Sequence, residues 1–291
     1  AGAACLTGTD EQAIANLPNI GDRPNEFVIS LIDSHYYVHQ GFCVAGGTLR
    51  KIGSKDAVTL ENYVEAIGPK TAAVVYFLGS QPIEDLPAIV TAAHAQDVPV
   101  IVDAAAQLPP RSNLIDLPAM QCDMTVFSGG KGLFGPQSTG LILGRKDLIE
   151  ACHLNSNPHS AIGRGMKVGK EEICALLRAV ELFFEMDEAA VVAEWERRCR
   201  IIAGAVADID GIEADFTRAY ENKFPPASPL VHLHFTDDAV KSAADTLEEL
   251  ETGEPSILAA GGGSSLTVGP QTLQEGEAEI IAERLRQILA G

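Results

Sequence analysis

The sequence has no apolar run long enough to cross a lipid bilayer, and no signal-peptide pattern opens the chain. Basic residues are also scarce: 21 lysines and arginines stand against 40 aspartates and glutamates, which gives a net charge of −19. Nucleic-acid binding requires a basic surface, so this charge argues against such a partner. We therefore expect a cytoplasmic protein with no membrane and no nucleic-acid partner.

Closely spaced cysteines are absent as well. None of the six cysteines forms a CxxC pair or another spacing typical of metal ligands. His232 and His234 stand two residues apart on an expected strand and could share one face of it, but no third ligand is evident. We expect reduced thiols and no metal site.

What the sequence does contain is a series of short apolar runs. Those at 71–78 and 98–102 are continuous, which is typical of strands buried on both faces. Helical patterns at 59–67 and 86–97 alternate with them. This alternation predicts an α/β fold with a mostly parallel sheet covered by helices. Further strands are expected at 27–32, 48–52, 123–127 and 139–144.

The pattern changes near residue 170. Residues 170–209 contain almost no helix breaker and carry apolar side chains at helical spacing. We predict two domains: a large α/β domain over 1–170 and, over 171–291, a linking helix or helices with a small α+β domain. The elements expected after the long helical stretch are strands at 212–217, 230–235 and 264–268, helices at 238–250 and 275–290, and a proline-rich loop at 224–229.

An acid and an amine follow two of the apolar runs. In "VPVIVDAAAQLPP" Asp103 directly follows strand 98–102, and in "FSGGKG" Lys131 follows strand 123–127. Ligands of open α/β sheets bind beyond the carboxyl ends of the strands. A lysine in such a crevice needs a charge partner or a use for its amine, such as condensation with an aldehyde. A carboxylate in the same crevice can pair with a pyridinium nitrogen.

Pyridoxal phosphate is a cofactor that would use both groups. The small residues at 104–106 would let a flat ring lie close to the strand, and Ser128 with the glycine-rich backbone could reach a phosphate. Each feature alone has a simpler interpretation, because an aspartate after a strand is usually a turn or cap and Gly-Gly-Lys-Gly is usually a surface loop. A nucleotide P-loop does not fit, since Gly132 follows the lysine where Ser or Thr is required. The residues alone leave the cofactor and surface-loop interpretations open.

The segments "VIVDAAAQLPP" and "SGGKGLFGPQSTGLILGRKDLIEA" resemble fold type I pyridoxal-phosphate enzymes, in particular the branch of bacterial selenocysteine synthase and D-glucosaminate-6-phosphate ammonia lyase. The segments at 163–177 and 268–289 are similar to the same branch, so the resemblance covers most of the chain. It implies the type I fold with a sheet of the seven-stranded type, and pyridoxal 5'-phosphate as cofactor. It also implies a glycine- and serine-rich phosphate-binding turn ahead of Ala1.

The resemblance assigns roles by position. Lys131 corresponds to the lysine that forms a Schiff base with the cofactor, and Asp103 to the acid that faces the pyridine nitrogen. Ala105 would pack on one face of the ring and His35 on the other, while Ser128 would hold the phosphate.

Some of these roles have alternatives. Tyr36 or Tyr37 could stack on the ring in place of His35, and Gln107 and Ser80 are possible contacts to the ring hydroxyl.

Three basic residues, Arg164, Lys167 and Lys170, cluster in this acidic chain. They could be an ordinary solvated surface, or they could bind a carboxylate or phosphate of the substrate. Fold type I enzymes commonly build their sites between two subunits, so the resemblance implies a homodimer or a larger homo-oligomer.

The reaction implied by the resemblance is that of a lyase. A small-molecule amino acid or amino sugar acid would lose its Cα proton, with Lys131 as the base, and α,β-elimination would lead to ammonia and a keto acid. The same lysine and aspartate would serve a transferase, either an aminotransferase or a β-replacement enzyme of the selenium-transferase kind, or a racemase. A non-catalytic homologue is a further alternative.

Overall fold

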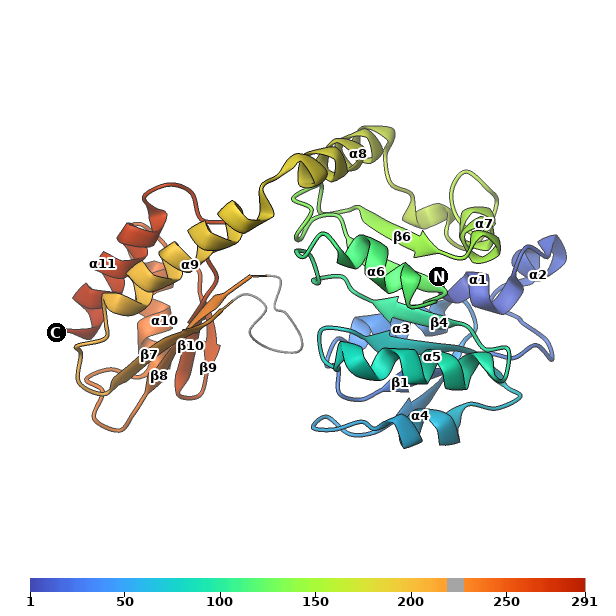
Figure 1. The fold of residues 1–291 in the computed structure, drawn as a ribbon, viewed down its shortest axis with the longest axis horizontal. Helices are drawn as coiled ribbons and strands as arrows, with labels where there is room; N and C mark the ends of the chain where they lie inside the picture. Colours follow the sequence, from blue (N-terminus) through green and yellow to red (C-terminus); the bar gives the residue numbers. More distant parts are fainter. Residues whose placement is uncertain (219–227, 291) are drawn as a thin grey trace. The chain divides into compact units, whose positions relative to one another are not determined.

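The computed structural model describes residues 1–218 and 228–290. The chain divides into two compact units, Ala1–Glu185 and Met186–Gly291 (Figure 1). The predicted domain boundary follows residue 170, whereas the first unit ends at Glu185. Helix α8 (Lys170–Glu185) occupies the stretch between these two positions. Most of the loop predicted at 224–229 falls outside the described residues.

The first unit contains a six-stranded sheet in the order β2-β1-β3-β4-β5-β6. Neighbouring strands are parallel except β6, which runs antiparallel to β5. The mostly parallel α/β sheet is confirmed, with six strands in the described residues where the resemblance implied a seven-stranded type. The strands are β1 (Glu26–Ser30), β2 (Thr48–Ile52), β3 (Thr71–Phe77), β4 (Val100–Asp103), β5 (Met124–Ser128) and β6 (Gly140–Gly144).

Helices cover both faces of this sheet, which explains why every residue of β3 is buried. On one face, Leu6, Phe42 and Leu148 come from three helices and share a core cluster with Phe27 of β1 and Val75 of β3. The helices on this face are α1 (Gly2–Thr7), α3 (Tyr36–Val44) and α7 (Lys146–Leu154). Those that Figure 1 shows on the other face are α4 (Leu60–Ala66), α5 (Leu86–His94) and α6 (Asn113–Ala119). A short helix, α2 (Glu11–Asn16), follows α1.

The long helical stretch predicted at 170–209 is two helices. Helix α8 ends at Glu185 and α9 (Glu188–Gly204) begins after Asp187, whose side chain accepts a hydrogen bond from the backbone N–H of Ala190 at 3.1 Å. Aspartate at an N-cap satisfies backbone donors that have no partner within the helix, so it favours a new start at this point.

The second unit is a small α+β fold with its own core. An antiparallel sheet in the order β7-β8-β10-β9 packs against helices through buried side chains such as Ile202, Leu233 and Leu285. Its remaining elements are β7 (Ile212–Thr217), β8 (Leu230–Phe235), α10 (Ala243–Thr252), β9 (Ala260–Gly262), β10 (Ser265–Val268) and α11 (Glu277–Leu289).

The structure also bears on membrane-spanning helices, disulfides and metal ligands. Across residues 1–218 and 228–290, no helix is both long and apolar enough to span a membrane. All six cysteines are free. His232 and His234 lie on β8, and the described residues contain no group of three or more potential metal ligands from His, Cys, Asp and Glu.

Candidate functional site

Residues that follow the carboxyl ends of four strands line one cavity of the first unit, with a volume of about 230 Å³. The strands are β1, β3, β4 and β5. From β1 the chain proceeds to β2 on one side of the sheet, whereas β3 and β4 follow on the other side. Crevices at such a reversal of strand order are the usual ligand sites of open α/β sheets. The topology therefore places the cavity where a ligand is expected.

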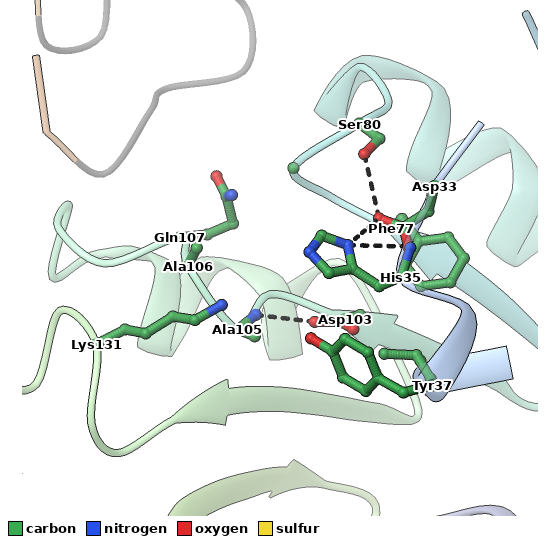
Figure 2. A pocket seen from close by; sticks show the side chains of 12 residues that line it. Asp33, His35, Tyr37, Phe77, Ser80, Asp103, Ala105, Ala106, Gln107 and Lys131 are labelled. Atoms are coloured by element: carbon green, nitrogen blue, oxygen red, sulfur yellow. Dashed lines mark hydrogen bonds and ion pairs between the residues drawn. The ribbon is translucent and has the colours of Figure 1, made fainter. Parts of the chain in front are cut away.

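Asp103 and Lys131 both line this cavity. Asp103 is the last residue of β4, and its Oδ1 accepts a hydrogen bond from the backbone N–H of Ala105 at 3.0 Å. Figure 2 shows the Lys131 side chain extending toward Ala105 and the end of β4. Lys131 has no hydrogen bond or salt bridge with any other described residue, so its amine is available to a ligand.

The electrostatics of Asp103 reflect its partly buried position. Burial raises the pKa of this carboxyl, and the nearby Asp33 adds to the effect by repulsion. The N–H of Ala105 and the charge of Lys131 act in the opposite direction and lower the same pKa. A cationic partner inside the cavity would therefore stabilise the ionised form of this carboxyl.

Glycines shape the loop that carries the lysine. A Cβ on Gly129 would lie 2.0 Å from Thr139 Oγ1, and one on Gly132 would lie 2.0 Å from the carbonyl oxygen of Leu108. Neither contact is possible between non-bonded atoms, so both positions need glycine for close approach. The glycine-rich sequence therefore has a packing reason as well as a chemical one.

A second charged group lies across the cavity from Lys131. The carboxylate of Asp33 accepts hydrogen bonds from the backbone N–H of His35 at 2.8 Å and from its ring Nδ1 at 3.0 and 3.1 Å (Figure 2). Ser80 Oγ donates to the same carboxylate at 3.5 Å. The His35 ring also meets the ring of Tyr37 edge-on, with 5.6 Å between centroids.

The structure brings most of the sequence-predicted site residues together. Besides Asp103 and Lys131, the predicted residues that line the cavity are His35, Tyr37, Ser80, Ala105 and Gln107.

Two of the residues predicted to contact the cofactor do not line it. Tyr36 is exposed on α3, and Ser128 ends β5, where its backbone N–H donates to the carbonyl of Ala105 at 3.3 Å.

The basic cluster lies elsewhere in the same unit. Arg164 donates to the carbonyl of Pro158, Lys170 pairs with Glu171, and Lys167 lines a separate cavity beside β6 and α8. None of the three basic residues borders the cavity of Asp103 and Lys131.

Sequence reasoning missed Asp33 and Phe77, which also line the cavity. Asp33 carried a usable signal, because it follows the apolar run of β1 as Asp103 follows that of β4. Phe77 carried none, since an aromatic residue at the end of a buried strand is ordinary core composition.

Comparison with known proteins gives consistent matches over nearly the whole chain. The family model described as Aminotransferase class-V matches residues 26–165. A 5'-C-glycyluridine monooxygenase-decarboxylase from Streptomyces sp is 32% identical over 99% of this chain and 72% of its own length.

The chain belongs to the fold type I pyridoxal-phosphate enzymes.

Two further relatives within the fold type I enzymes define the branch. A D-glucosaminate-6-phosphate ammonia lyase from Salmonella typhimurium is 29% identical over 98% of this chain and 76% of its own. An L-seryl-tRNA(Sec) selenium transferase from Nitratidesulfovibrio vulgaris is 26% identical over 84% of this chain and 58% of its own. The solved structure of D-glucosaminate-6-phosphate ammonia-lyase matches with a TM-score of 0.76 and 28% identity, over 99% of this chain and 77% of that one.

These matches confirm three predictions: the family and its branch, the fold class, and pyridoxal phosphate as the cofactor. They also support the interpretation of the chain as an enzyme of the lyase type.

The cavity fits this cofactor by the chemistry of its lining. Gln107 is buried, and its Oε1 has no hydrogen-bond partner among the described residues. A buried acceptor of this kind calls for a donor from a bound molecule or water. The same cavity is lined by Lys131, whose amine has no partner among the described residues, and by the small side chains of Ala105 and Ala106.

Proposed function

We propose that the protein is a pyridoxal-phosphate-dependent lyase that removes the Cα proton of an amino acid or amino sugar acid and eliminates a β-substituent. The observation that carries the proposal is the shared cavity of Asp103 and Lys131, an acid and an amine that approach it from the ends of neighbouring strands. The ammonia-lyase relative supports the type of reaction.

The cofactor supplies one piece of chemistry when bound: its ring withdraws electrons from the substrate's Cα, which makes the Cα proton acidic. In the proposal, the amine of Lys131 would hold the cofactor, and the same amine would take the Cα proton of the substrate. The Asp103 carboxylate favours a proton on the ring nitrogen, because a positively charged partner stabilises a carboxylate that burial otherwise disfavours.

The other walls of the cavity orient the ring. We propose that Ala105 lies against one face and His35 against the other, with Gln107 and Ser80 as candidate contacts to the ring hydroxyl. For Ser128 we retain the proposal of a phosphate contact, supported by its position at the carboxyl end of β5 beside the glycine loop.

Substitution of Lys131 tests the proposal. Lys131→Ala should abolish the visible absorbance of the bound cofactor and the release of ammonia and keto acid from D-glucosaminate-6-phosphate or a β-substituted amino acid. The matched control is Lys146→Ala, an exposed lysine at the start of α7 that should leave both readouts unchanged. Retained colour and turnover in Lys131→Ala would contradict the assignment.

The product assay also separates the alternatives. Transfer of the amino group to a keto acid would indicate an aminotransferase, and loss of optical activity without ammonia release would indicate a racemase. Release of carbon dioxide under air is a further outcome, favoured by the 32% identity to a monooxygenase-decarboxylase.

Three further features of the proposal come from the sequence. We propose that the protein acts as a homodimer or larger homo-oligomer and that it works in the cytoplasm. Free cysteines support the reducing compartment. The cluster of Arg164, Lys167 and Lys170 is proposed to bind an anionic group of the substrate across the subunit interface of that assembly, supported by its positive charge in an acidic chain.

A further inference from the structure

Asp33 forms an unusually complete set of contacts at the wall of the cavity. Its side chain is only 8% exposed, whereas that of His35 is 56% exposed. Both carboxylate oxygens lie within 3.1 Å of His35 Nδ1, and Oδ1 also accepts from the His35 backbone. A buried carboxylate needs such donors, since an unpartnered one would be costly to desolvate.

We propose that Asp33 is a positioning residue that holds the imidazole of His35 in a single tautomer and presents its Nε2 atom to the cavity. An ionised carboxylate only accepts hydrogen bonds, so the ring nitrogen beside it must carry the hydrogen. In a neutral imidazole the other nitrogen is then a hydrogen-bond acceptor. Figure 2 shows this second nitrogen on the side of the ring away from Asp33, toward the segment with Ala106 and Gln107.

The consequence is an acceptor of defined direction on the wall that faces Lys131. It can receive a hydrogen bond from an amine or hydroxyl of a bound amino substrate, and the opposite tautomer could not. This part of the inference rests on the proposed function, because that function supplies the substrate. The tautomer itself does not depend on it.

Ordinary helix capping does not account for the arrangement. His35 is the N-cap of α3, and one oxygen of Asp33 suffices for its backbone N–H. Asp187 illustrates the simpler case, because it is exposed and accepts from a backbone N–H at the start of α9. At Asp33 the carboxylate is buried and engages the imidazole as well.

Nitrogen-15 NMR of the full-length protein tests the tautomer directly. Long-range proton–nitrogen spectra are recorded at alkaline pH, where imidazole groups are neutral, with and without cofactor, and the His35 signals are assigned with His35→Gln. In the unmodified protein Nδ1 should carry the hydrogen. In Asp33→Asn, whose amide can donate to Nδ1, the hydrogen should move to Nε2 in most molecules.

Steady-state kinetics test the consequence. Asp33→Asn should lower kcat/KM by about tenfold or more, because the variant loses the acceptor for the bound substrate. Asp187→Asn, the same substitution at a helix cap outside the cavity, should leave the tautomer and kcat as they were.

An unmodified protein with the hydrogen on Nε2 would overturn the inference, even if Asp33→Asn failed to fold. So would an Asp33→Asn variant whose tautomer changes while kcat/KM does not. Failure of the proposed function would look different: no lyase product would form from any substrate, while the Nδ1–H signal of His35 would persist.

Discussion

The partly buried carboxyl of Asp103 adds little to the stability of the unliganded protein. Its pKa is raised by burial and by repulsion from Asp33, so the charged form is disfavoured in the folded chain. Groups held in this way commonly belong to functional sites, because the cost is recovered when a ligand binds.

The charge of Asp103 predicts opposite effects of Asp103→Asn on turnover and on stability. Turnover should fall by roughly a hundredfold, because the amide cannot favour a proton on the ring nitrogen. The cofactor-free variant should nevertheless be more stable than the unmodified protein at neutral pH. A raised pKa in the folded state means that the contribution of Asp103 to stability is present in acid and is lost as pH rises through that value.

Denaturant unfolding of both cofactor-free proteins between acid and neutral pH measures this difference in stability. The advantage of Asp103→Asn should vanish at the acid end, where the aspartate is protonated in both the folded and unfolded states. An advantage that is independent of pH would show that charge is not its cause.

At the residue scale, the sequence predicted the pair Asp103 and Lys131 because each follows a clear apolar run. It could not predict the Asp33–His35 contact. A side-chain hydrogen bond depends on rotamers and on the turn between β1 and α3, and neither has a periodic signature.

Close packing fixes the position of the glycine-rich loop that carries Lys131. Gly132→Ala places a methyl group 2.0 Å from the carbonyl oxygen of Leu108, so the loop must move to accept it. We expect the variant to lose most of its bound cofactor, as measured by visible absorbance after dialysis, while far-ultraviolet circular dichroism stays the same.

The control for this substitution is Gly68→Ala. Gly68 has open space around its Cβ position and no left-handed backbone angle, so the added methyl group should not affect cofactor retention. Full retention by Gly132→Ala would mean that the loop tolerates displacement and does not fix the position of Lys131.

The sequence predicted those helices and strands that have a strong apolar pattern, and missed those that depend on tertiary packing. Strands β1, β3, β4 and β5 were found because each is apolar and mostly buried. Helix α3 was not found, since "YYVHQGFCV" has no helical periodicity. Its Phe42 packs against Phe27 of β1, with 4.8 Å between the centroids of the two tilted rings, and this contact helps to hold the helix in place. The break between α8 and α9 rests on the cap by Asp187 in an otherwise continuous pattern.

At the scale of the whole molecule, the proposed assembly leads to a further prediction. Helix α8 exposes Ile173, Leu177 and Phe184, with Leu177 61% exposed. Exposed apolar side chains on one helix favour a protein contact. Sedimentation equilibrium should therefore give a mass of at least twice the 30.8 kDa of one chain, and Leu177→Glu should shift the protein toward monomer.

Leu258→Glu serves as the control, because Leu258 is 84% exposed in a loop of the second unit and should leave the mass unchanged. A single-chain mass at all concentrations for the unmodified protein would contradict the proposed assembly.

The fold class was predictable at this scale because strand–helix alternation restricts the topology to a few possibilities. The composition of the cavity was only partly predictable, since strands distant in sequence meet there. Residues from positions 33 to 131 contribute to it, and their proximity depends on the strand order.

Every residue that lines this cavity belongs to Ala1–Glu185. A mutant library restricted to 186–291 would thus leave the reactive walls untouched. Any change in substrate preference selected from such a library would report what the second unit contributes, separately from the chemistry itself.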